Sequence, residues 1–295
     1  MSVHSGSGFR LQAEGGTRGA ADLLWDCWQN GRRLQSIPED IRPRTREEGY
    51  AVQALLEERS ASPLFGWKIA ATSTAGQKHI NVTGPLAGRL LREKAIDVSR
   101  RGGEAATTEL PFGVNHMKVA EAEFAFRMGR DLPPRDQPYS VDEALAAVKT
   151  LHPAIEVPDS RFDDFTIVGA PQLIADNACA HQFVLGPAAT MDWRALDLVE
   201  HRVMGSVVVM GSVVGRPFTG RQEPALTREG KGANVLGDPR VALAWLANEL
   251  SGLGITLKAG EVVTTGTCLV PLPIQPGSEI KMDFGVLGHV SAQMV

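Results

Sequence analysis

Two glutamates, Glu121 and Glu123, stand one residue apart in the alternating segment 119–128. In a β-strand, residues two apart project from the same face, so their carboxylates would lie side by side. Like charges at that spacing repel unless a cation neutralises them, and hard divalent cations such as Mg²⁺ bind carboxylate oxygens. The alternative is a solvated strand edge that carries two exposed acids, since charged side chains are mostly exposed.

A third acid, Glu156, lies in the apolar segment 154–157, which reads as a short strand. Burying a charge there without a partner would be costly. If this strand lies beside the one that carries Glu121 and Glu123, three carboxylates converge and form a facial metal site. The pair alone favours the exposed-edge interpretation, and the third acid shifts the balance toward a metal.

Lys68 is the second candidate for chemistry, because it lies between Trp67 and Ile69 in the apolar segment 64–70. Partial burial could lower its pKa or suit it to hold an anionic group of a substrate. The alternative is an ordinary lysine whose aliphatic stem lies on the protein while its ammonium reaches water.

Other motifs with recognised chemistry are absent from the sequence. It contains no nucleophile elbow, phosphate-binding loop or HExxH zinc motif. The seven histidines are scattered, and three cysteines far apart lack CxxC spacing. We therefore expect neither a thiolate zinc site nor a disulfide framework, and we expect buried cysteines.

Composition indicates a globular protein, with 295 residues, 43% of them hydrophobic, and a formal net charge of −4. No block of Lys or Arg supports binding to nucleic acid. No run approaches ~18 consecutive apolar residues, and no signal-peptide pattern begins the chain, so we expect no membrane span and a cytoplasmic location.

Periodicity and capping patterns predict the elements around these candidates. An apolar helical face and the stop at 30–31 predict a first helix, and Thr45 with Glu48 predicts a second one that ends near 59. Ser140 with Glu143 predicts a helix before the strand of Glu156. Val-rich runs over 203–215 predict a hairpin that turns near 210–212, and Asp238 predicts a helix that ends at Gly252.

Helices followed mostly by strands predict an α+β protein rather than a regular βαβ array. The Gly- and Ser-rich segment 1–19 has few apolar residues and is expected to be a disordered, mobile tail. We expect residues 20–110 to form an N-terminal helical and cap region, and residues 111–295 to form a β-rich, metal-binding catalytic core.

The chain resembles the 2-keto-4-pentenoate hydratases, which belong with the 4-oxalocrotonate decarboxylases to the fumarylacetoacetate hydrolase superfamily. The resemblance covers about residues 21–295 and rests on short segments that occur in the family's order. These are GWKIAATS over 66–73, KVAEAEFAF over 118–126, IEVPDSR over 155–161, ADN over 175–177, GANVLGDP over 232–239, AWLAN over 244–248 and FGVLG over 284–288.

This resemblance implies the superfamily's mixed β-roll fold, a bound Mg²⁺ or Mn²⁺ and a homo-oligomer. Glu121, Glu123 and Glu156 match the family's metal carboxylates, and Lys68 matches its active-site lysine. We hypothesise a hydro-lyase whose metal binds a 2-keto acid and stabilises its enolate while water adds to the alkene. Lys68 would orient the substrate carboxylate or transfer a proton, and Ser160 and Asp176 would help with positioning.

One departure from the family pattern concerns the proton-transfer step. Members usually carry an acid and an aromatic residue after a proline, whereas this chain has Leu86 and Ala87 after Pro85. If that acid is essential for hydration, a 4-oxalocrotonate-type decarboxylation through the same enolate is the natural alternative. A non-catalytic partner subunit or a repurposed enzyme is the third possibility.

Overall fold

Two β-sheets and the helices around them make up the computed structural model, which describes residues 6–60, 62–99, 107–209 and 226–295. The helices are α1 Gly6–Asn30, α2 Arg46–Glu57, α3 Thr74–His79, α4 Val141–Ala146, α5 Ala170–Ala175 and α6 Pro239–Gly252. The strands are β1 Gly66–Ala70, β2 Leu86–Leu90, β3 Ala95–Asp97, β4 Thr108–Leu110, β5 Val119–Met128, β6 Val148–Val157, β7 Gln182–Leu185, β8 Arg202–Val209, β9 Leu226–Lys231, β10 Val262–Thr267, β11 Leu272–Pro273, β12 Ser278–Asp283 and β13 His289–Met294.

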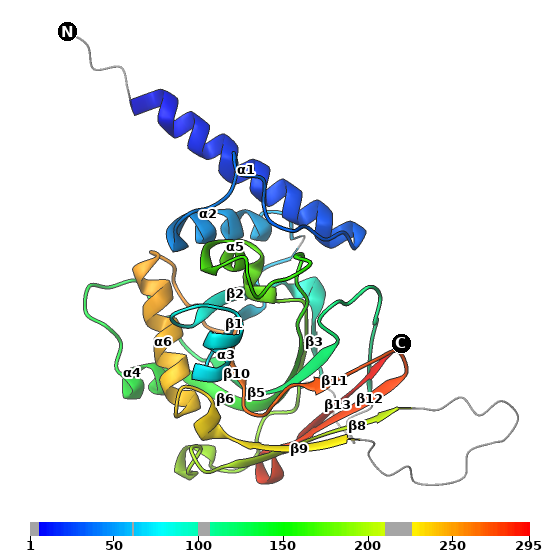
Figure 1. Cartoon of the computed structure of the whole chain (residues 1–295). Helices are drawn as coiled ribbons and strands as arrows, with labels where there is room; N and C mark the ends of the chain where they lie inside the picture. The colour runs from blue at the N-terminus through cyan, green and yellow to red at the C-terminus, as the bar shows by residue number, and fades with distance from the viewer. Residues whose placement is uncertain (1–5, 61, 100–106, 210–225) are drawn as a thin grey trace, which may run out of the picture.

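The larger sheet has the strand order β2-β1-β10-β5-β6-β7-β3, and β11 pairs with β5 at one end. The smaller sheet has the order β4-β13-β12-β8-β9. Figure 1 shows the larger sheet curled, with α1, α2 and α5 stacked over one end, α6 along its side and the smaller sheet at the other end. Helices and antiparallel pairs in this arrangement confirm the predicted α+β class.

Strand β5 is central because its two faces have different surroundings, as its alternating sequence predicts. Its apolar face is buried in the main core, where the ring of Phe124 meets that of Phe284 edge-on with centroids 5.1 Å apart. Phe284 follows β12, so this face of β5 packs toward the smaller sheet. The other face of β5 carries Glu121 and Glu123 and is left for the site.

The predicted helix starts are confirmed at three positions. The side chain of Thr45 accepts a hydrogen bond from the backbone N–H of Glu48 at the start of α2. Ser140 and Glu143 form a complete capping box before α4, and the side chain of Asp238 accepts from the N–H of Arg240 before α6. Each cap satisfies a backbone donor that would otherwise lack a partner.

The N-terminal segment differs from the predicted mobile tail over 1–19, because α1 begins at Gly6. A Cβ atom at Gly19 would lie 3.4 Å from Cγ2 of Ile41, an ordinary van der Waals distance, so α1 runs close to residue 41 there. Ala20 and Ala21 are fully buried in the cluster beneath α1. Residues 1–5 lie outside the described residues.

The region 20–110, predicted as an N-terminal helical and cap region, contains α2 and the end of α1 but also β1, β2 and β3, which pair within the same sheet as β5. Strand β8 of the predicted hairpin is present and pairs antiparallel with both β12 and β9. The turn predicted near 210–212 lies outside the described residues. Among the helices that the structure describes, none is long and apolar enough to cross a membrane.

Candidate metal centre

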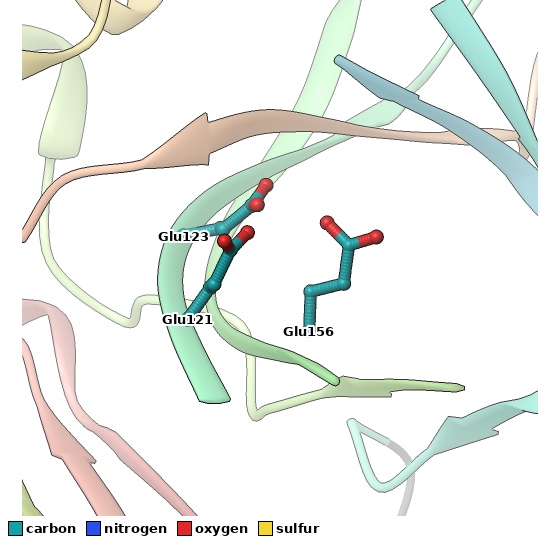
Figure 2. Close-up of side chains that lie close together, drawn as sticks. All are labelled: Glu121, Glu123 and Glu156. Atoms are coloured by element: carbon teal, nitrogen blue, oxygen red, sulfur yellow. The ribbon is translucent and has the colours of Figure 1, made fainter. Parts of the chain in front are cut away.

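Three glutamate carboxylates meet on the polar face of the larger sheet. Strands β5 and β6 are antiparallel neighbours, and their register places Glu121 directly opposite Glu156. Glu123 shares the face of Glu121, and one carboxylate oxygen from each of the three lies within 4.8 Å of the others. Figure 2 shows the three carboxylates turned toward a common space. The convergence predicted from the sequence is therefore present.

Several oxygen atoms in this cluster are buried without a hydrogen-bond donor. Glu123 and Glu156 are 0% exposed, and neither oxygen of Glu156 nor Oε1 of Glu123 has a hydrogen-bond partner. A buried carboxylate oxygen without a donor is costly, and native proteins avoid it unless an ion or water completes the site. Oxygen donors from several carboxylates are the ligands that Mg²⁺ and Mn²⁺ prefer, so these residues fit such a metal.

Glu123 is held in place by a bulge in β10 that the sequence did not reveal. Its Oε2 accepts hydrogen bonds from Thr264 Oγ1 and from the backbone N–H of Gly266, the latter at 2.8 Å. Gly266 has φ +93°, and a Cβ atom there would lie 2.1 Å from Oγ1 of Thr72. Only glycine fits this position, and its N–H therefore reaches Glu123. These bonds leave Oε1 free to face the cluster.

Lys68 lies against the same cluster and is 3% exposed. Its Nζ lies 3.1 Å from Oε1 of Glu156, an ion pair outside hydrogen-bonding geometry, and it donates a hydrogen bond of 3.1 Å to the carbonyl oxygen of Ala178. Burial by itself lowers the pKa of Lys68, but Glu156, Glu121 and Glu123 outweigh it and raise that pKa. With no metal at the cluster, the pKa of Lys68 is therefore raised rather than lowered as suggested from the sequence, which favours the ammonium form.

The charges of the cluster indicate the valence of a cation that would fit it. Burial and the charge of Glu156 raise the pKa of Glu121 to about 7, and burial, Glu156 and Glu121 raise the pKa of Glu123 well above its ordinary range. Fully ionised, three carboxylates and the Lys68 ammonium leave two negative charges uncompensated. A divalent cation would balance them and keep all three carboxylates ionised.

A cavity of about 1040 Å³ opens above the cluster, and both Lys68 and Glu121 line it. Glu121 keeps partial exposure at this surface, whereas Glu123 and Glu156 lie beneath it. Leu86 also lines the cavity, and its place opposite Ala70 in the β1–β2 register puts it on the same sheet face as Lys68. A small molecule in the cavity can therefore reach the ammonium and the carboxylate cluster together.

Ser160 and Asp176 are brought together, but away from this cavity. The hydroxyl of Ser160 donates to Oδ2 of Asp176 at 2.8 Å, and the Arg161 guanidinium pairs with the same carboxylate. Both residues are buried, and neither lines the cavity. The Arg161 guanidinium also stacks on the Trp28 ring, 4.5 Å from its centroid. Their hydrogen bonds indicate a supporting role behind the site.

That network ends in a backbone turn at the cavity wall. Asn177, Ala178 and Cys179 all have positive φ, between 50° and 61°. Consecutive left-handed residues other than glycine are strained, and they need surrounding bonds to hold them. The side chain of Asn177 exchanges two hydrogen bonds with the backbone of Arg89, at 2.6 and 2.8 Å. The sequence signal for Asn177 was its place after Asp176 in the ADN segment, but its role depends on contacts with β2.

Comparison with known proteins identifies the family. Residues 69–295 match the family model described as fumarylacetoacetate (FAA) hydrolase C-terminal. The chain belongs to the fumarylacetoacetate hydrolase family. A family relative, the 2-keto-4-pentenoate hydratase of Paraburkholderia xenovorans (strain LB400), is 31% identical over 277 residues, which is 93% of each chain. The 4-oxalocrotonate decarboxylase of Pseudomonas sp. (strain CF600) is 28% identical over 269 residues, 89% of this chain and 90% of that one.

The fumarylacetoacetate hydrolase fold is also seen by structural comparison. The 4-oxalocrotonate decarboxylase from Pseudomonas putida G7, complexed with magnesium and adipate, superposes with a TM-score of 0.79 at 23% identity, covering 96% of this chain and 98% of that one. The predicted superfamily fold, a curled mixed sheet with N-terminal helices, is confirmed. Relatives with hydratase and decarboxylase names both align along most of the chain, which places it in that branch of the family.

Proposed function

We propose that this chain is a lyase that depends on Mg²⁺ or Mn²⁺ and adds water to an unsaturated 2-keto acid such as 2-hydroxypenta-2,4-dienoate. The observation that carries the proposal is the cluster of Glu121, Glu123 and Glu156, with buried oxygens that accept no hydrogen bond, below a cavity. The hydratase names of relatives near 30% identity support the reaction, and the magnesium in the decarboxylase structure supports the metal.

The three glutamates would hold the metal through the oxygens that face one another. When bound, the metal supplies positive charge that favours enolisation of a 2-keto acid whose oxygens it contacts. Glu123 can serve with Oε1, because Thr264 and Gly266 occupy its other oxygen. Glu121, at the cavity surface, would face the substrate side, while Glu156 lies below.

Lys68 would bind and orient the acidic end of the substrate. Its raised pKa keeps three N–H donors on Nζ, and only Ala178 accepts a hydrogen bond from them within the described structure. A substrate carboxylate or 2-oxo oxygen can therefore accept one from the cavity side. We propose that Ser160 and Asp176 act indirectly, because they support the turn that presents the Ala178 carbonyl to Lys68.

A 4-oxalocrotonate-type decarboxylation stays the second candidate because of one observation. Leu86 gives the cavity an apolar wall on the sheet face of Lys68, so it supplies no proton there. Loss of carbon dioxide from a 2-keto acid needs the same enolate but no water addition.

We also propose a homo-oligomer, and light scattering of the purified protein tests this: the mass of one chain would refute it.

Turnover assays separate these functions. The protein is incubated with 2-hydroxypenta-2,4-dienoate in Mg²⁺ or in EDTA, and loss of the ultraviolet absorbance of the diene is followed; release of carbon dioxide from 4-oxalocrotonate is measured in parallel. We expect loss of absorbance only with the metal. No turnover of either substrate by folded, metal-loaded protein would refute the lyase proposal and favour a non-catalytic or repurposed member.

A further inference from the structure

The cavity differs in character between its floor and its walls. Lys68 and Glu121 provide charge at the floor, whereas much of the remaining wall is apolar. The wall residues that matter most here are Ile80, Leu86, Met117, Phe165, Leu236 and Leu269. We infer that the substrate of this chain is a 2-keto acid with one carboxylate and a bulky uncharged substituent at the far end. This inference rests on the proposed function and names its substrate class.

The size of the cavity supports a bulky substituent. Its volume of about 1040 Å³ lies at the upper end of the roughly 300–1,000 Å³ found for pockets that hold drug-sized ligands. An unsubstituted pentadienoate has very few heavy atoms and would leave much of this space to water. An alkyl or aryl group in place of that water would bury apolar surface against apolar walls, which favours binding.

The apolar wall is held in place before any ligand arrives. Leu86 and Leu269 are buried members of the main core, and Ile80, Met117, Phe165 and Leu236 pack against that core. The Phe165 ring also meets the His79 ring edge-on, with centroids 5.9 Å apart. A substituent that enters this space would meet side chains that are already ordered, so little conformational entropy is lost on binding.

The charges of the cavity argue against a second carboxylate on the substrate. Among the described residues that line it, Lys68 alone is a lysine or arginine, and the proposed function assigns it to the carboxylate at the metal end of the substrate. Apart from the imidazole of His79, the polar side chains of the wall, such as Gln77 and Asn234, carry no charge. A carboxylate at the far end would therefore leave water without a lysine or arginine partner, which is unfavourable. The dicarboxylate 4-oxalocrotonate fits this cavity less well than a monocarboxylate does.

Binding of saturated 2-keto acids tests this substrate class apart from turnover. Calorimetry with the whole protein in Mg²⁺ compares 2-oxopentanoate, 2-oxo-5-phenylpentanoate and the dicarboxylate 2-oxohexanedioate, which have no alkene to hydrate. We expect the phenyl compound to bind at least about tenfold more tightly than 2-oxopentanoate, and the dicarboxylate to bind no more tightly than 2-oxopentanoate. Tightest binding of the dicarboxylate, or no preference for the phenyl group, would overturn the inference.

Two variants with the same chemical change sharpen the test. Ile80→Arg places a cation on the cavity wall and should tighten binding of 2-oxohexanedioate relative to 2-oxopentanoate by about tenfold. Ile167→Arg makes the same change at a side chain that is 71% exposed and does not line the cavity, so this ratio should not change. If the affinity of 2-oxohexanedioate relative to 2-oxopentanoate is the same in both variants, Ile80 does not line the site where these acids bind.

The outcomes of the two proposals are distinguishable. Hydration of 2-hydroxypenta-2,4-dienoate without any preference among the three saturated acids would leave the lyase proposal standing and refute the substrate class. The expected order of binding without turnover of any dienoate would refute the hydration reaction while supporting the assigned binding surface.

Discussion

Replacing Glu123 by glutamine changes one buried carboxylate into an amide of nearly the same shape. Oε2 of Glu123 accepts hydrogen bonds from Thr264 and Gly266, so the oxygen of the amide must stay at that position. The NH₂ group is then forced to the position of Oε1, which has no hydrogen-bond partner in the cluster. The oxygen that we propose as a metal ligand is thereby replaced by a donor that cannot bind a cation.

The size of the effect follows from the burial of the cluster. Breaking a buried ion pair costs about 3–5 kcal/mol, so loss of one anionic ligand should raise the Kd for Mg²⁺ at least about 100-fold. Without metal, burial and the charges of Glu156 and Glu121 raise the pKa of Glu123 and disfavour its ionised form, so a neutral amide of the same shape replaces it at little cost. We therefore expect the free energy of unfolding in EDTA to change by less than about 1 kcal/mol.

Calorimetric titration and thermal unfolding measure the two quantities. With Mg²⁺ at about 100 times the wild-type Kd, the wild-type protein gains about 2.7 kcal/mol, or roughly 5 °C in Tm, and the variant gains almost none of it. Glu261→Gln is the matched control, because Glu261 is a buried acid outside the cluster that accepts from Trp67. The reasoning fails if Glu123→Gln binds Mg²⁺ within about threefold of wild type, or if its Tm falls equally in EDTA and Mg²⁺.

Three further predictions concern groups around the site. Lys68→Met removes a cation from beside Glu156 and from the wall of the cavity, so turnover should fall by at least about 100-fold. Because the same cation repels a metal ion at the cluster, the variant should bind Mg²⁺ several-fold more tightly in calorimetry. Weaker Mg²⁺ binding would contradict this. Asn177→Leu removes both hydrogen bonds that join the left-handed turn to the backbone of Arg89, so kcat should fall about tenfold or more. Asn177→Asp keeps the acceptor for the N–H of Arg89, so it should recover part of this loss. Burial and the nearby Arg161 lower the pKa of His181 from 6.5 to about 3. The neutral imidazole therefore gives its full contribution to the free energy of unfolding above pH 6.5, and this contribution is lost as the pH falls from 6.5 toward 3. Between pH 7 and 5 this loss should be about 1–2 kcal/mol, and denaturant unfolding should show a shallower pH dependence in His181→Gln.

Some parts of the fold could be predicted from the sequence because they depend on local patterns. The alternation of β5, the caps at Thr45, Ser140 and Asp238, and the end of α1 at Asn30 each follow from neighbouring residues. The tail over 1–19 was predicted from its glycines, but the structure places part of α1 there, with Gly16 and Gly19 close to residues 40–41. Composition alone could not show that contact, because it joins segments that are apart in the chain.

The candidate site shows the same division between local and distant information. The shared face of Glu121 and Glu123 follows from the two-residue period of a strand. That Glu156 stands opposite Glu121 depends on the register of β5 and β6, which the sequence around either strand does not specify. Lys68 was recognised as a candidate, but its raised pKa depends on the carboxylates that the fold places around it.

By itself, the sequence determined which side chains could carry the chemistry and which face of β5 would hold two of them, because side-chain direction in a strand alternates with position. Only the tertiary structure decided which of those side chains meet. Strand pairing places Glu156 and Lys68 at the cluster. Asp176 is instead bonded to Arg161 and Ser160, outside the lining of the cavity. Contacts between distant segments depend on the packing of the whole chain, and no local pattern encodes them.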